Sequence, residues 1–184
     1  MLGSRGDELF HFAHGQDARE LVLEQDFKSI GEETTFPEDV PRMEQVYPVM
    51  NLLVQDVGFR LRQAGQGARK ITVKLRLANF ITLTRSKTLD QAVQADQKIY
   101  QTAVELIKAM NPIGPFRLLG LQLSNLESSS WLCQLSLWDD GGGRREAELH
   151  RVVDGLRGKY GRPVLFRAAG LTAGRDRAGR KAKR

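Results

Sequence analysis

One stretch of this 184-residue sequence concentrates side chains of the kind that bind phosphate. Residues 69–89 carry six basic side chains and no acidic one, with hydroxyl side chains among them. Lysine and arginine attract polyanions, and hydroxyl groups donate hydrogen bonds to phosphate oxygens. Successive side chains on one strand face stand about 7 Å apart, close to the spacing of phosphates along a nucleic-acid strand. The candidate phosphate ligands in this stretch are Thr72, Lys74, Arg76, Thr82, Thr84, Arg85, Ser86 and Lys87.

The distribution of charge favours a polyanionic partner, although an ordinary solvated sheet face has the same pattern. The net charge of the chain is +6, and two local blocks hold most of its basic character. One block is the acid-free stretch 69–89, and the other is the tail 174–184, which we expect to be disordered. A localised basic block is more typical of nucleic-acid binding than a diffuse excess of charge.

A second candidate site is a short linear motif between a serine-rich and a glycine-rich stretch. Spaced apolar anchors in a linker are suited to docking in the groove of a partner protein. The alternative is that these side chains pack on their own domain, as most apolar anchors do. The motif consists of Gln134, Leu135, Ser136, Leu137 and Trp138.

The sequence offers no convincing catalytic or metal-binding constellation. His11 and His14 can share a helix face, but no third ligand is near them in sequence. Cys133 is the single cysteine, so no internal disulfide can form, and it has no nearby histidine partner. The polar N-terminus lacks a secretion signal, and no apolar run is long enough to cross a membrane. We expect a cytoplasmic protein without catalytic residues or a metal of its own.

Hydrophobic periodicity predicts the elements that position these side chains. Residues 70–78 alternate between apolar and polar side chains and form a β-hairpin with the strand that starts at residue 81. The apolar residues of 44–64 and 91–110 recur at helical spacing. Strands are also predicted at 28–36 and 116–124, with a turn at 37–41.

This order of elements predicts an α+β fold of the ferredoxin-like, split βαβ type (βαββαβ). Such a fold has a four-stranded antiparallel sheet with two helices on one face, and its other face is open. We expect the threonine, lysine and arginine side chains of the hairpin to lie on the open face. The predicted organisation is a helical fragment at 1–24, a main domain at 25–126, a linker at 127–143, a C-terminal extension at 144–173 and the tail at 174–184.

Several stretches together resemble the Y-family translesion DNA polymerases of the bacterial DNA polymerase IV type. They occur in the order of that family and cover about residues 1–138, which makes the resemblance more specific than any single motif. Residues 6–9 and 13–15 resemble the end of the thumb domain, and residues 134–138 resemble the bacterial sliding-clamp-binding motif. The stretches that resemble the little finger domain are 28–36, 71–80, 81–89 and 116–126.

The resemblance implies that the domain holds primer–template duplex DNA by its phosphates and recruits the bacterial sliding clamp. By motif match, Lys28, Ser29 and Gly31 join the hairpin residues as DNA contacts. Trp138 stands where this family usually has phenylalanine, and both residues are aromatic anchors. The first 24 residues would be a remnant of the thumb.

In this family the palm and fingers domains carry the metal-binding carboxylates and hold the nucleotide, and this sequence has no counterpart to them. We therefore expect a monomer that needs no Mg²⁺ or other cofactor and does not polymerise by itself. One alternative is a catalytically inactive, polymerase-derived adaptor in a repair assembly. Another is an unrelated RNA-binding ferredoxin-like module, which requires aromatic residues that stack on bases, and Phe80 is the one candidate near the hairpin.

Overall fold

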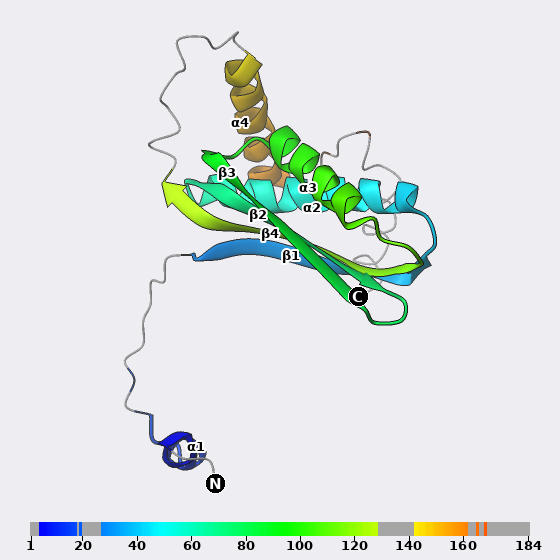
Figure 1. Cartoon of the computed structure of the whole chain (residues 1–184). Helices are drawn as coiled ribbons and strands as arrows, with labels where there is room; N and C mark the ends of the chain where they lie inside the picture. The colour runs from blue at the N-terminus through cyan, green and yellow to red at the C-terminus, as the bar shows by residue number, and fades with distance from the viewer. Residues whose placement is uncertain are drawn as a thin grey trace.

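The computed structural model of this chain describes residues 4–17, 19, 27–128, 142–161, 165 and 168. Four strands and two long helices form the central domain, and a further helix lies near each end of the chain (Figure 1). In chain order the elements are α1 (Ser4–Ala13), β1 (Ser29–Val40), α2 (Met43–Gln63), β2 (Gln66–Leu77), β3 (Thr82–Val93), α3 (Asp96–Met110), β4 (Phe116–Ser128) and α4 (Gly142–Tyr160).

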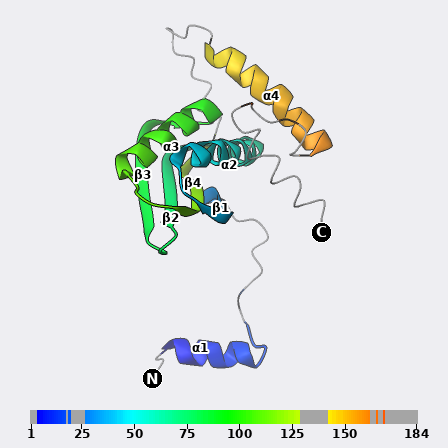
Figure 2. The ribbon, with the colours of Figure 1, turned by 90° about the vertical axis from the view of Figure 1, so that its right-hand side faces the viewer.

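The sheet has the strand order β1-β4-β2-β3, and every neighbouring pair is antiparallel. Helices α2 and α3 both cover the same face of it, and none of the described helices lies on the opposite face (Figure 1, Figure 2). The predicted α+β fold, with a four-stranded antiparallel sheet and two helices on one face, is therefore confirmed.

The core lies between the sheet and the two helices because alternate strand residues are apolar. Ile71, Val73 and Leu75 of β2 are fully buried there, while the residues between them are partly exposed. This alternation leaves Thr72, Lys74 and Arg76 on the opposite side of the sheet. The buried residues that the other elements contribute include Leu53, Val57, Leu61, Ile99, Ile107, Leu119, Leu121 and Leu123.

Several predicted boundaries are wrong, and two of the differences replace one kind of element by another. The turn expected at residues 37–41 is absent, because β1 continues to Val40 through an irregularity in its pairing after Thr35. The helix expected from residue 91 begins at Asp96, because β3 extends to Val93, which pairs with Ala68 of β2. Helical spacing alone did not separate the last residues of a strand from the first turn of the following helix.

Helix α4 packs on the helical layer, near the end of α2 and the start of α3, and leaves the open side of the sheet uncovered (Figure 2). The Arg62 guanidinium of α2 donates hydrogen bonds to Asp154 of α4, at 2.6 and 3.1 Å, and to Asp96 of α3 at 2.7 Å. Arg157 of α4 donates to the Gln55 side chain at 2.6 Å. The C-terminal extension thus contains a helix that is attached to the domain.

Some predictions fall outside the described residues. They are the linear motif at 134–138 and the basic tail at 174–184.

Candidate nucleic-acid interface

The open side of the sheet presents four rows of side chains, each of which crosses β1, β4, β2 and β3 in that order. Strand register defines the rows, because residues opposite each other in an antiparallel pair share a face. We call this set of residues the open face. Its rows are Thr35–Leu118–Arg76–Thr82, Glu33–Gly120–Lys74–Thr84, Gly31–Gln122–Thr72–Ser86 and Ser29–Ser124–Lys70–Thr88.

Each strand gives the open face a different chemical character. Strand β2 supplies the cations Lys70, Lys74 and Arg76, whereas β3 supplies a hydroxyl group in every row. The rows contain a single acid, Glu33 of β1. The Nε of Arg76 donates to the Thr82 hydroxyl at 3.0 Å, which holds the guanidinium beside the β3 hydroxyl column. A surface of this composition attracts a polyanion and offers it hydrogen-bond donors.

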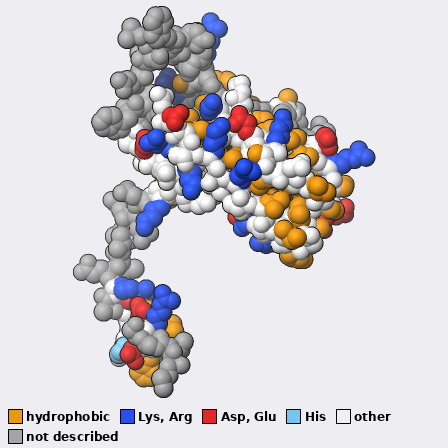
Figure 3. All heavy atoms as spheres, viewed as in Figure 1, with side chains coloured by type: hydrophobic (Ala, Val, Ile, Leu, Met, Phe, Trp, Pro, Cys, Tyr) orange, Lys and Arg blue, Asp and Glu red, His pale blue; other side chains and the backbone are white. Residues whose placement is uncertain are grey.

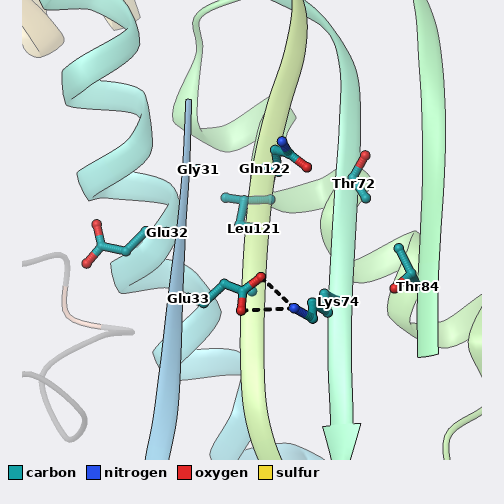
Figure 4. Close-up of a pocket in the computed structure, with 9 residues that line it drawn as sticks. Gly31, Glu32, Glu33, Thr72, Lys74, Thr84, Leu121 and Gln122 are labelled. Atoms are coloured by element: carbon teal, nitrogen blue, oxygen red, sulfur yellow. Dashed lines mark hydrogen bonds and ion pairs between the residues drawn. The ribbon is translucent and has the colours of Figure 1, made fainter. Parts of the chain in front are cut away.

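A shallow hollow of about 540 Å³ lies at the middle of the open face. Figure 4 shows the side chains of Thr72, Lys74 and Thr84 around it. Two glycines, Gly31 and Gly120, contribute bare backbone to its floor. Both have a packing reason to be glycine: a Cβ on Gly31 would lie 3.0 Å from the Leu121 carbonyl oxygen, and one on Gly120 would lie 2.8 Å from the Glu33 Cγ.

Glu33 and Lys74 form an ion pair within this hollow (Figure 4). The Lys74 Nζ donates to the two carboxylate oxygens of Glu33 at 2.9 and 3.1 Å. The two residues belong to β1 and β2, which β4 separates, and they meet above Gly120. Their side chains are 48% and 32% exposed, so water and other anions can reach the pair.

The structure corrects the expected position of Arg85 and Lys87, which do not lie on the open face. They are opposite Val73 and Ile71 in the β2–β3 register and so point toward the helical side. The Arg85 Nη1 donates to the Ala109 carbonyl of α3 at 2.6 Å, and the Lys87 Nζ pairs with Glu105 of α3 at 2.9 Å. Lys87 thereby keeps the pKa of the Glu105 carboxyl below its ordinary value.

The sequence and the fold also match known proteins. Residues 27–137 match the impB/mucB/samB family C-terminal domain, which covers the whole sheet and both helices of the central domain. The chain belongs to this family. The domain is similar to DNA polymerase IV 1 of Mesorhizobium japonicum, with 32% identity over 175 residues, and to DNA polymerase IV of Caulobacter vibrioides, with 34% identity over 180 residues.

These matches include 95% and 97% of this chain but only 39% and 42% of the two polymerases, so the chain spans about two fifths of the relatives' length. Among solved structures, a Y-family DNA polymerase chimera of Dbh and Dpo4 shares the fold, with a TM-score of 0.51 and 17% identity over 68% of this chain and 36% of that one. The predicted resemblance to a Y-family polymerase C-terminal domain is therefore confirmed.

In this Y-family domain the open face includes residues that the sequence analysis did not select. Lys70 and Thr88 lie in the last row, and alternation with Thr72 and Ser86 was a signal that could have identified them. Gln122 and Ser124 of β4 lie on the open face because of their register with β1 and β2, which the sequence did not reveal. The structure places Ser29 and Gly31 on the open face, as the resemblance implies, and Lys28 directly precedes β1.

The remaining candidates of the sequence analysis lie elsewhere in this domain. The aromatic residue Phe80 lies in the turn between β2 and β3, where it is 64% exposed and stacks on the Arg117 guanidinium, and none of the four rows contains an aromatic residue. Exposed apolar side chains, including Ile81 and Ile113, gather at that end of the domain (Figure 3). Base stacking of the kind that RNA-binding sheets use therefore has no platform on the open face.

Among the described residues, no three histidine, cysteine or acidic side chains come together as a metal site. The Nδ1 atoms of His11 and His14 instead lie 2.9 Å from the Gln16 side-chain oxygen and the Phe10 carbonyl oxygen, respectively. In the same part of the chain, no helix has both the length and the apolar character required to span a membrane.

Proposed function

We propose that this domain binds duplex DNA by its phosphates across the open face, as the little finger domain of an error-prone translesion polymerase of the DNA polymerase IV type. The observation that carries the proposal is the layout of that face. A column of cations on β2 lies beside a column of hydroxyl groups on β3, with one acid in four rows and no helix above them. The polymerase IV relatives support the same role.

The chemistry of the open face suits binding that does not depend on base sequence. Cations and hydroxyl groups hold phosphate oxygens, and such contacts position a protein on DNA without reading its bases. The exposed glycine Gly31 at the edge of the hollow lets a phosphate approach backbone atoms closely. A polymerase that advances along its template requires this kind of grip, because each step shifts the duplex by one phosphate.

In this proposal, Arg85 and Lys87 are a second set of DNA contacts that lies beside the open face. They belong to β3, the edge strand of the sheet, and their side chains are exposed. To bind a phosphate they would first have to leave Ala109 and Glu105, which reduces their net contribution. Lys28 stands at the opposite edge, where β1 begins.

The proposal is tested by titration of duplex DNA at several salt concentrations. Each phosphate contact contributes about −0.9 to the slope of log K against log salt concentration. We expect the Lys70→Ala/Arg76→Ala variant to bind more weakly, with a slope about 2 smaller in magnitude, because two open-face cations are lost. The matched variant Arg85→Ala/Lys87→Ala also loses two cations, and we expect a smaller change.

Binding of the unmodified domain that does not depend on salt would contradict a phosphate interface. A larger decrease of the salt slope in Arg85→Ala/Lys87→Ala than in Lys70→Ala/Arg76→Ala would contradict the placement of the DNA interface on the open face. Thermal unfolding of both variants serves as the control for folding.

We also propose that residues 134–138 recruit the bacterial sliding clamp. The support is the sequence pattern from Gln134 to Trp138, a glutamine followed by spaced apolar anchors, and the family match that reaches residue 137. In the same proposal the protein acts in the cytoplasm, as a monomer, in DNA damage bypass. Nucleotidyl transfer and its Mg²⁺ would belong to a catalytic portion that corresponds to the unmatched part of the relatives.

A further inference from the structure

The contact between Glu33 and Lys74 depends on an unusual gap in the sheet surface. Strands β1 and β2 are not neighbours, so residues in one row of these strands are separated by roughly twice the 4.8 Å strand spacing. The residue between them in the row is Gly120, which has no side chain to keep them apart. A Cβ at this position would lie 2.8 Å from the Glu33 Cγ. The glycine therefore lets the carboxylate extend across β4 to the lysine.

Glu33 occupies the place of an anionic ligand on this surface. Its carboxylate presents two oxygens to the Lys74 Nζ, at 2.9 and 3.1 Å, as a phosphate group does when it binds a lysine. It is the single acid in the four rows of the open face, and it lies beside the hollow at the centre of that face. Gly31 and Thr35, the neighbours of Glu33 on β1 that also lie on the open face, are uncharged.

We propose that Glu33 is a built-in competitor that occupies Lys74 in place of a DNA phosphate and so weakens the grip of the open face on duplex DNA. The inference rests on the proposed function, because it concerns the same surface. A phosphate that approaches Lys74 must displace the carboxylate, and it also meets the negative charge of Glu33. Lys74 therefore contributes less free energy to DNA binding than Lys70 or Arg76 does. The weaker contribution favours release of the duplex and movement of the domain along it.

Folding requires little from this ion pair, so the variants that test the proposal should be folded. Both side chains are substantially exposed, and exposed ion pairs contribute little to stability. The substitution Glu33→Gln keeps the length of the side chain, which therefore still covers Gly120, but it removes the negative charge. Glu148→Gln is the control, because it also removes an exposed acid, but on helix α4 rather than on the open face.

The experiment measures binding of a fluorescently labelled DNA duplex by anisotropy between about 50 and 300 mM salt, a range in which the slope per phosphate contact is resolved. We expect Glu33→Gln to bind about three- to tenfold more tightly near 100 mM salt, with a slope steeper by about 0.9, because Lys74 becomes available to one phosphate. Glu148→Gln should differ from the unmodified domain by less than about twofold, because α4 lies on the side of the domain away from the open face. In a Lys74→Met background, the gain from Glu33→Gln should disappear.

Unchanged or weaker binding by Glu33→Gln would overturn the competitor role. A gain that persists in the Lys74→Met background would also overturn it, because the effect would then be a general one of net charge. Failure of this inference can be distinguished from failure of the proposed function. If only the competitor role of Glu33 fails, the Lys70→Ala/Arg76→Ala variant still loses salt-dependent binding. If the proposed function fails, that variant binds DNA as the unmodified domain does.

Discussion

The basic side chains of the β2–β3 hairpin fall into two groups, and their position in the strand decides which group each joins. Lys74 and Arg76 occupy the open face, whereas Arg85 and Lys87 lie on the helical side, where α3 provides acceptors for both. Successive residues of a strand point to opposite faces, so a shift of one position changes the partner of a charged side chain completely. Charge alone therefore does not identify the cations that lie on the open face.

A residue-level prediction concerns the pair between Lys87 and Glu105. We expect Lys87→Met to raise the pKa of the Glu105 carboxyl towards its ordinary value, because the hydrogen bond and the positive charge of Lys87 stabilise the carboxylate. NMR titration of the Glu105 side-chain carboxyl measures this shift. Lys98→Met is the control, since Lys98 lowers the same pKa less, and should produce the smaller rise.

The sign of the related stability effect follows from the lowered pKa. The stabilising contribution of the pair is present above the ordinary pKa of glutamate and is lost as the pH falls through the lower pKa of folded Glu105. The stability difference between the unmodified domain and Lys87→Met should therefore decrease on acidification. An unchanged Glu105 pKa in the variant would show that the pair does not form in solution.

At the level of elements, α4 is attached to the domain by polar rather than apolar side chains. Among the residues of α4 whose burial is described, the buried ones are His150, Asp154 and Arg157. Burial alone would lower the pKa of the Arg62 guanidinium, but the hydrogen bonds and charges of Asp154 and Asp96 outweigh it and raise that pKa. Burial lowers the pKa of Arg157. Leu149, Val152, Leu156 and Tyr160 are exposed on the same helix and Val153 is half-buried, so the hydrogen bonds of Asp154 and Arg157 are the main attachment of α4.

An element-level prediction concerns Asp154. We expect Asp154→Ala to weaken the attachment of α4 by about 2 kcal/mol or more, because a mostly buried guanidinium loses one of its two carboxylate partners. Amide hydrogen exchange within α4 measures this loss of protection. Alanine has a higher helix propensity than aspartate, so a loss cannot be attributed to a weaker helix.

Glu148→Ala is the matched control, because Glu148 is exposed on the same helix. DNA affinity should be unchanged in Asp154→Ala, since α4 lies on the side away from the open face. Protection of α4 equal to that of the unmodified domain would contradict the role assigned to this cluster.

The molecule as a whole separates its two proposed interactions. The open face lies on one side of the sheet, and the helical layer with α4 lies on the other (Figure 2). The proposed clamp motif belongs to the segment between β4 and α4, outside the described residues. Binding of DNA and binding of the clamp therefore depend on different parts of the chain, and each should be removable without the other.

A prediction for the whole molecule is that Trp138→Ala weakens clamp binding and leaves DNA binding intact. Truncation of a central aromatic anchor typically costs 2 kcal/mol or more, so the affinity for the bacterial sliding clamp should fall by about 30-fold. Calorimetry with the whole chain and with a peptide of residues 130–140 measures this change. Trp131→Ala, outside the motif, is the control, and failure of the unmodified chain to bind a functional clamp would exclude clamp recruitment.

Local patterns of residues were sufficient to predict the class of fold and the faces of the side chains in β2. Alternation of apolar and polar residues in β2 and helical spacing in α2 are local patterns, and they predicted both elements correctly. The same alternation puts Arg85 on the side of Leu83, so its face could have been predicted from sequence. Grouping these residues by charge led to the wrong placement.

The tertiary structure decided the rest. The register of three strands brings Gly120 between Glu33 and Lys74, and the packing of α4 brings Asp154 to Arg62. These contacts join residues 41 and 92 positions apart, respectively. A periodic pattern reports only the few residues within one turn or strand, whereas contacts over such distances depend on how complete elements pack together.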